Sequence, residues 1–411
     1  MALTHTSNSS SVLRDGDEID SCDKNEGDLN ILKKAMRVSY RFLAFCLLVM
    51  LLLPQSASQV HADGGAPNLA YVAGTSHGIS VIDILQQKVT RTIAVNGDPH
   101  TILLSLDGRF LYVTQPAIGR VAVIVARTGQ TYCTANLPGH PTLLALGTDT
   151  TTLYAADNDG NISAIDSTTC AIRETFEAHD RVYGLVVAGV TTGNNILSDQ
   201  LWVAGTDALL LFNAKGQQLA SVPIAGGPQS LCIPTGSTAY VATRQGTVVA
   251  VDLNTLHVSP PLLTGGKFGI MDYDAITLEI FVPDQQAKQI DVLSPFTIGA
   301  ILPPQEPERV IRLNASPQTV AISSDGQFAF VALSGGEIAM LDIPAHRTIK
   351  TIPVGGTPHF IIIGLYPPPG NIVPLQTASS PNIILIVLFS VLAAAALLVV
   401  LWLVWRQHKK T

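Results

Sequence analysis

The sequence predicts an all-β fold, a seven-bladed β-propeller with an N-terminal signal segment and one C-terminal transmembrane helix. Three features support this prediction: a repeated strand-turn-strand pattern, short apolar strands separated by close turn signals, and two apolar segments outside the repeats. The pattern is clearest over residues 107–130, where an Asp-Gly turn, an apolar strand, a glycine turn and an alternating strand follow one another. Charged residues are only 13% of the chain and the mean hydropathy is +0.34, values typical of a chain with membrane-seeking segments.

The repeat has seven copies, each marked by an aromatic anchor residue that valine or alanine follows. Successive anchors lie about 40 to 50 residues apart, which is the period of a four-stranded propeller blade. The anchors are Tyr71, Tyr112, Tyr154, Trp202, Tyr240, Phe281 and Phe330. Since each repeat buries its apolar face only against its neighbours, we expect one large domain over residues 63–365.

The N-terminal part of the chain divides into two segments. Residues 1–35 are rich in Ser, Asp and Glu and poor in apolar residues, so we expect them to be disordered. Residues 36–62 resemble a signal peptide, with a basic flank, an apolar core of about twelve residues and a small-x-small cleavage motif. The alternative is an uncleaved anchor with its acidic head in the cytoplasm. The sequence also leaves open whether translation starts at Met1 or at Met36.

Within each repeat we expect four strands: an innermost strand, the anchor strand, a third strand after the glycine turn, and an outer strand. The repeats begin on an anchor strand near Leu69 and end on an innermost strand at residues 358–364. We therefore predict that the first blade combines residues 69–96 with residues 357–364. This pairing would close the ring and remove the open sheet edge that invites aggregation.

The C-terminal part of the chain predicts a membrane tether. Residues 366–382 form a Pro- and Ser-rich linker, and residues 383–405 form an uncharged apolar segment long enough to cross a hydrocarbon core of about 30 Å. The basic tail, residues 406–411, holds that end in the cytoplasm. We therefore expect a single-pass protein of the cell membrane whose propeller is extracytoplasmic.

The cysteines do not require a disulfide in this interpretation. Cys22 and Cys46 precede the predicted cleavage point, which leaves Cys133, Cys170 and Cys232. We place Cys133 and Cys170 on the outer strands of successive blades, and because such strands diverge we expect the two side chains to be out of disulfide reach. Three buried free thiols is the favoured interpretation. No Cys/His spacing indicates zinc, and we expect no cofactor.

Histidines and acids gather just before the innermost strands of the first blades, at one mouth of the predicted channel. These ligand-binding candidates are Asp98, His100, His140, His179, Asp180 and His359. Neutral imidazole and carboxylate groups ligate divalent metals or act as general bases, and the sequence does not decide whether a metal is bound. The alternative, which we favour, is a structural role in which these side chains satisfy backbone groups at the channel lip.

With the repeats laid out, the chain resembles the YVTN-repeat family of seven-bladed β-propellers, which is related to lactonase-type and surface-layer propellers. The resemblance rests on residues 112–115 (YVTQ), Gly119 with the VAVI that follows, Gly78 with SVIDI, and residues 317–333. Gln115 departs from the family's Asn, and the fourth and sixth repeats depart further. Because the family includes lactone hydrolases, ligand- or DNA-binding proteins and surface proteins, the resemblance implies an architecture more than an activity.

We interpret the chain as a membrane-anchored extracytoplasmic propeller that acts as a binding or interaction module for an unknown ligand or protein. The alternative is an extracytoplasmic lactonase-type hydrolase that uses the channel-mouth His/Asp cluster, so the sequence leaves open whether the protein is an enzyme. A nucleic-acid partner is not expected, because the formal net charge is -7 and the Lys and Arg residues are scattered.

Overall fold

The computed structural model of the chain describes residues 69–191, 197–234, 236–296, 298 and 307–367. The chain divides into the unit Met1–Asp63 and the unit Gly64–Thr411, and all of the described residues belong to the second unit. The predicted disordered segment 1–35, signal segment 36–62, membrane helix 383–405 and tail 406–411 lie outside the described residues, as does nearly all of the linker 366–382.

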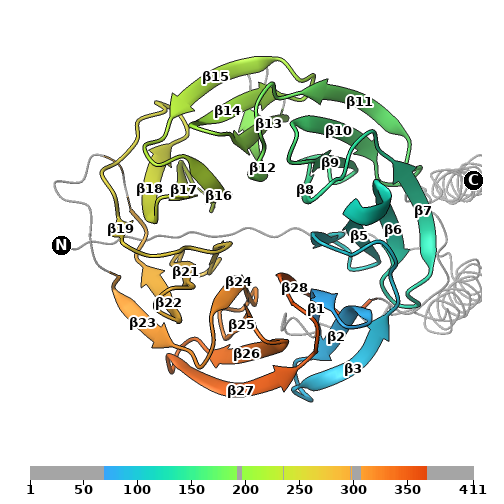
Figure 1. Cartoon of the computed structure of the whole chain (residues 1–411), viewed down its shortest axis with the longest axis vertical. Helices are drawn as coiled ribbons and strands as arrows, with labels where there is room; N and C mark the ends of the chain where they lie inside the picture. Colours follow the sequence, from blue (N-terminus) through green and yellow to red (C-terminus); the bar gives the residue numbers. More distant parts are fainter. Residues whose placement is uncertain (1–68, 192–196, 235, 297, 299–306, 368–411) are drawn as a thin grey trace, which may run out of the picture. The chain divides into compact units, whose positions relative to one another are not determined.

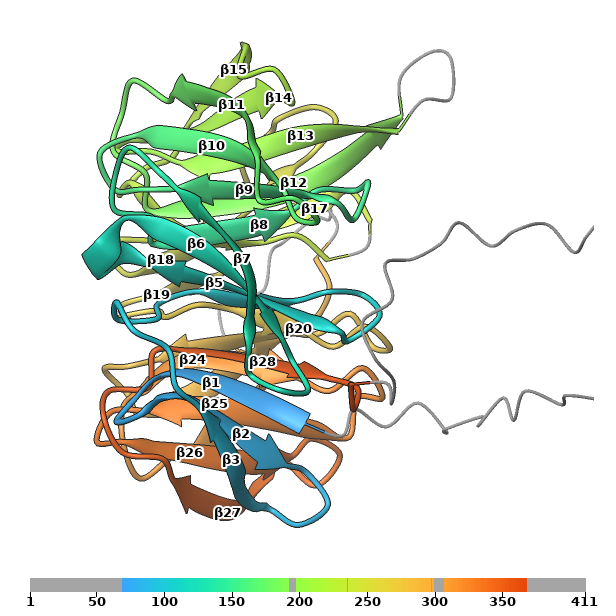
Figure 2. The same cartoon turned by 90° about the vertical axis from the view of Figure 1, so that its right-hand side faces the viewer.

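The described residues form seven antiparallel sheets of four strands each, arranged as blades around a common axis (Figure 1). This arrangement confirms the predicted seven-bladed β-propeller. In each blade the innermost strand lies next to the axis and the outermost strand lies at the rim, and the same sheets are seen from the side in Figure 2. One 3-10 turn, η1 (Pro116–Ile118), interrupts the second blade. Within the part of the chain that the structure describes, no helix is long and apolar enough to cross a membrane.

The strands follow the predicted order from the axis outward. The innermost strands are β28 (Phe360–Gly364), β4 (Ile102–Leu104), β8 (Leu143–Leu146), β12 (Gly184–Thr191), β16 (Pro228–Cys232), β20 (Asp272–Tyr273) and β24 (Pro317–Ile322). The second strands are β1 (Leu69–Thr75), β5 (Phe110–Gln115), β9 (Thr152–Ala156), β13 (Leu197–Ala204), β17 (Thr238–Thr243), β21 (Ile280–Asp284) and β25 (Phe328–Leu333).

The outer half of each blade is built in the same way. The third strands are β2 (Gly78–Asp83), β6 (Arg120–Val125), β10 (Asn161–Asp166), β14 (Ala208–Asn213), β18 (Thr247–Asp252), β22 (Gln289–Leu293) and β26 (Glu337–Asp342). The rim strands are β3 (Lys88–Ile93), β7 (Thr131–Asn136), β11 (Ile172–Glu177), β15 (Gln218–Pro223), β19 (Leu263–Thr264), β23 (Arg309–Arg312) and β27 (Arg347–Pro353).

The seven aromatic anchors all lie on second strands, and all are buried between neighbouring sheets. The side chains of Tyr71 and Trp202, for example, have no exposed surface. Second and third strands are apolar on both faces because each sheet is covered by a blade on either side, whereas rim strands such as β11 are mostly exposed. The repeat pattern therefore reflects the packing between blades.

The predicted ring closure is confirmed. The last strand, β28, pairs antiparallel with the first, β1, over the register from Leu69 opposite Gly364 to Ala73 opposite Phe360. The first blade is therefore completed by residues from the opposite end of the repeat region, and Figure 1 shows the two ends of the colour sequence side by side in one sheet. The pairing covers the edge of β1, which would otherwise be an open sheet edge.

The expectation of three free thiols is wrong. Cys133 and Cys170 form a disulfide with a Cα–Cα distance of 5.9 Å, and Cys232 is the free, buried thiol among the described cysteines. Cys133 does lie on a rim strand, β7, but Cys170 lies in the turn between β10 and β11 with a φ of 58°. This turn directs Cys170 into the interface between blades 2 and 3, where both cysteines pack against one apolar cluster.

Candidate functional site

Two histidines from neighbouring blades meet at the strand-start mouth, which we define as the end of the axis where the innermost strands begin. The ring centroids of His100 and His359 are 4.5 Å apart. His100 Nδ1 lies 3.0 Å from the carbonyl oxygen of Thr142, and His359 Nδ1 lies 2.8 Å from that of Thr357. A carbonyl can only accept, so we assign the proton of each ring to Nδ1, which leaves each Nε2 with a free lone pair.

The position of His359 depends on a glycine beneath it. Gly74 has a φ of +79°, and a side chain there would overlap the His359 ring and the carbonyl of Thr357. His359 Nε2 is buried and has no hydrogen-bond partner among the described residues. The unsatisfied acceptor is therefore held in place by backbone packing.

The surroundings of His100 disfavour its protonation. Burial lowers the pKa of His100, and the neighbouring His359 lowers it further, whereas the Thr142 carbonyl and the Asp98 carboxylate act in the opposite direction. Asp98 itself is exposed, in a left-handed conformation with a φ of 56°. His100 therefore resists protonation around neutral pH and presents its Nε2 as a hydrogen-bond acceptor.

The other three predicted residues do not join the pair. His140 Nδ1 lies 2.7 Å from the carbonyl of Pro116, and the His179 side chain is 82% exposed beside Glu177. Asp180 accepts hydrogen bonds from the amides of Arg181 and Thr206.

Desolvation opposes ionisation of Asp180, yet the hydrogen bonds from Thr206 and Arg181 lower the pKa of this carboxyl group overall. Asp180 thus fixes the connection into blade 4. In the part of the chain that the structure describes, no group of three or more His, Cys, Asp or Glu side chains is placed to hold a metal ion.

A cavity of about 380 Å³ lies on the axis just inside the strand-start mouth. Thr101 and Phe360, which follow His100 and His359 in the chain, line it, and Leu103, Leu143 and Leu231 form much of the remaining wall. The volume is within the range of small-molecule sites, about 300 to 1,000 Å³. Sequence analysis did not single out this cavity, because the apolar residues of innermost strands are equally consistent with a filled core.

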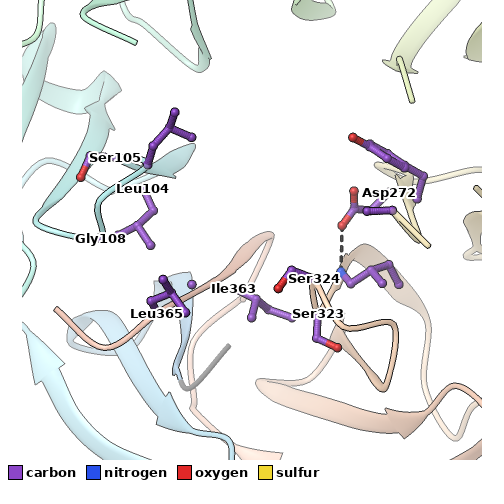
Figure 3. Close-up of a pocket in the computed structure, with 13 residues that line it drawn as sticks. Leu104, Ser105, Gly108, Asp272, Ser323, Ser324, Ile363 and Leu365 are labelled. Atoms are coloured by element: carbon purple, nitrogen blue, oxygen red, sulfur yellow. Dashed lines mark hydrogen bonds between the residues drawn. The ribbon is translucent and has the colours of Figure 1, made fainter. Parts of the chain in front are cut away.

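A second cavity, of about 420 Å³, lies at the strand-end mouth, where the innermost strands finish (Figure 3). Its walls include the apolar residues Leu104, Ile363 and Leu365, and Asp272 is the one charged residue among the described residues that line it. The Asp272 carboxylate accepts a 2.8 Å hydrogen bond from the amide of Ile322 (Figure 3). Leu104 lines both cavities.

Solved structures share this architecture. The chain is similar to the dihydro-heme d1 dehydrogenase NirN, solved in complex with DHE, with 14% identity, a TM-score of 0.53 and coverage of 72% of this chain and 74% of that one. It is also similar to the β-propeller domain of Cps50 (Swd1) from Myceliophteria thermophila, with 15% identity, a TM-score of 0.57 and coverage of 68% and 92%. The fold is that of a β-propeller. No protein-family model matches the chain, and no curated protein sequence matches it.

Proposed function

We propose that the chain is a single-pass membrane protein that displays its propeller on the extracytoplasmic side as a binding or interaction module. The observation that carries this proposal is the disulfide between Cys133 and Cys170. Disulfides persist in oxidising compartments and are rare in the cytosol, so this disulfide agrees with the export signal expected over residues 36–62. The apolar segment 383–405 and the basic tail after it supply the proposed anchor.

The binding role rests on the fold and on the two cavities. Propellers commonly act as interaction modules, and cavities of about 380 and 420 Å³ are large enough for small ligands or for side chains of a partner. The described chain leaves the ring at the strand-end mouth, because Leu365 lines the cavity there. In this proposal the His100 and His359 pair lies at the opposite mouth from the tether, where partners have access. We also propose that the chain is a member of the YVTN-repeat family that its sequence resembles.

A topology experiment tests the proposed display. A reporter fused after Thr411 should read as cytoplasmic, and an epitope tag inserted within residues 368–382 should be labelled on intact cells. A reporter at Thr411 that reads as extracytoplasmic, or a tag labelled only after the cells are opened, would contradict the orientation. A matched tag at the cytoplasmic C-terminus controls for cell integrity.

The His100 and His359 pair is the observation that favours a second candidate, an extracytoplasmic lactonase-type hydrolase. Nε2 of His100, which carries the free lone pair of a ring whose pKa is lowered by burial, is suited to accept a proton from an attacking water. A lactone panel should then be hydrolysed by the wild type and at least about 100-fold more slowly by His100→Ala. Hydrolysis that is equal in the two proteins would remove His100 from the reaction, and no hydrolysis by the wild type would remove the candidate.

A further inference from the structure

The charge of Asp272 is specific to one blade. In every blade the aromatic anchor of the second strand pairs with one residue of the innermost strand, and that partner is uncharged in six blades. In chain order of the anchors, the seven partners are Ile362, Leu103, Ala145, Val186, Cys232, Asp272 and Ala321. The repeat therefore does not require a carboxylate at the position opposite the anchor. Blade 6 has one there, and it lines the strand-end cavity.

Among the described residues, the surroundings of Asp272 offer no positive charge. The titratable groups that interact with it are Cys232 of β16 and Tyr273 of its own strand, and burial raises the pKa of both. Desolvation also raises the pKa of Asp272 to about 6, although the amides of Ile322 and Tyr273 act against this shift. At pH 7.5 the carboxylate is thus ionised beside two neutral groups, and none of the described residues that line the cavity is cationic.

An ionised group held in this way costs folding free energy unless a ligand pairs with it. A carboxylate accepts at about four lone-pair positions, so two backbone amides leave acceptor capacity unused. Two serines that line the cavity direct their hydroxyl groups to other carboxylates. Ser105 and Ser323 each donate to the aspartate of an adjoining turn, at 2.7 and 2.6 Å respectively.

We propose that the strand-end cavity binds an alkylammonium group, whose cationic head pairs with Asp272 and whose hydrocarbon part packs on Leu104, Ile363 and Leu365. This proposal names a ligand class for the binding role proposed above and rests on that role, but it does not depend on the membrane anchor. Calcium needs six to eight oxygen ligands, and this cavity supplies one carboxylate. The same ammonium chemistry is found in free amines and in lysine side chains of partner proteins.

The test measures dissociation constants for the full-length protein in non-ionic detergent at pH 7.5. The probes are n-hexylammonium for a free amine and Nα-acetyl-lysine methylamide for a lysine side chain, with 1-hexanol, hexanoate and Ca²⁺ as comparisons. At least one ammonium probe should bind, and the tighter one identifies the source. Hexanol or hexanoate binding as tightly as hexylammonium would overturn the proposal, as would Ca²⁺ displacing the amine at equal concentration.

Two variants assign the binding to this mouth. Asp272→Asn should weaken ammonium binding at least about tenfold, because the partner charge is removed from a desolvated site. Asp98→Asn makes the same chemical change at the opposite mouth and should leave the dissociation constant unchanged; its left-handed backbone tolerates Asn. Equal binding by wild type and Asp272→Asn would overturn the proposal, and a cooperative thermal melt of the variant establishes that it is folded.

The pH profile gives an independent result. With a pKa of about 6, Asp272 is mostly protonated at pH 5 and mostly ionised at pH 7.5. Binding of n-hexylammonium to the wild type should therefore weaken about tenfold from pH 7.5 to pH 5, whereas binding to Asp272→Asn should not change over this range. A flat wild-type profile would contradict the role of Asp272. The two proposals can fail separately. If no ammonium probe binds, the topology experiment still tests the membrane display; if the propeller is cytoplasmic, the binding measurements still test the ammonium site.

Discussion

At the residue scale, the aromatic anchors are buried alike but differ in the partners of their polar atoms. Tyr154 donates a 2.9 Å hydrogen bond to Asp199, whereas the hydroxyl of Tyr71 is buried and has no hydrogen-bond partner among the described residues. An unsatisfied buried hydroxyl lowers stability, and a satisfied one contributes to it. The two anchors therefore offer a matched pair of substitutions.

We predict opposite responses to the loss of the two hydroxyls. Tyr154→Phe should lower the free energy of unfolding by about 1 to 2 kcal/mol, because it removes a hydrogen bond to a carboxylate. Tyr71→Phe should leave it unchanged or raise it by up to about 1 kcal/mol. Urea unfolding of both variants at pH 7 gives the comparison, and a Tyr71→Phe variant as destabilised as Tyr154→Phe would show that the Tyr71 hydroxyl has a partner.

Asp272 predicts a pH-dependent difference in stability. Its pKa is about 6 in the fold and about 3.8 in the unfolded chain, so between these values the native state holds a proton that the unfolded state has lost. The contribution of Asp272 to stability is therefore largest below pH 4 and is lost as the pH rises to about 6.

The variant Asp272→Asn isolates this contribution from those of the other carboxyl groups. Its stability relative to wild type should increase by on the order of 1 to 3 kcal/mol between pH 4 and pH 7, without ligand. Thermal or urea unfolding at a series of pH values measures the difference. A difference that is constant over this range would mean that the pKa of Asp272 is not raised.

The sequence was informative about residues that repeat and less so about residues that break the repeat. His100 and His359 were found because both follow a proline before an innermost strand, and the structure brings their rings together. Asp272 was missed, although the pairing register shows it as the one charge among seven equivalent positions. The sixth repeat is divergent, and without the register its innermost strand could not be aligned residue by residue.

At the element scale, the strand order within blades followed from the repeated strand-turn-strand pattern and its aromatic anchors. Each sheet buries its middle strands against both neighbours, so these strands are apolar in every repeat. The error concerned a turn. Cys170 was placed on a strand, but it occupies a left-handed position in the β10–β11 turn that directs its side chain toward β7 of the preceding blade. A φ of 58° in a non-glycine residue leaves no reliable trace in a single sequence, so the disulfide could not be predicted from strand geometry.

The disulfide links blades 2 and 3 and should stabilise their interface. Its partners are separated by 37 residues in the chain, for which loop-closure entropy suggests a contribution of about 2 to 4 kcal/mol. The double variant Cys133→Ala/Cys170→Ala should therefore lower the free energy of unfolding by about that amount, as should reduction of the wild type by dithiothreitol.

The matched control is the double variant in dithiothreitol. Its denaturation midpoint should not shift on adding the reductant, because Cys232 is buried and unpaired. If reductant shifts the double variant as much as the wild type, the effect does not come from this disulfide.

At the scale of the whole molecule, ring closure joins the two ends of the propeller in one sheet. The pairing of β28 with β1 joins blade 7 to blade 1, and an apolar cluster that includes Ile361 and Ala70 fills that interface. The closure could be predicted from the sequence because the repeats begin on a second strand and end on an innermost one.

Two truncations test the closure. A chain that ends at Pro367 keeps β28 and should melt like the full-length propeller, whereas a chain that ends at Gly355 lacks β28. The shorter chain should lose the cooperative transition or unfold at least about 10 °C earlier, because it exposes the edge of β1 and opens one blade interface. Equal melting temperatures would mean that blade 1 is stable without its innermost strand.

The proposed function predicts that the whole propeller folds in an oxidising compartment, and thiol trapping tests this most directly. Intact cells expressing the full-length chain are quenched with acid and alkylated under denaturing conditions, and peptides are analysed without reduction. We predict a peptide that links Cys133 to Cys170 and an alkylated Cys232. Alkylation of both Cys133 and Cys170 in protein taken from intact cells would contradict the extracytoplasmic assignment.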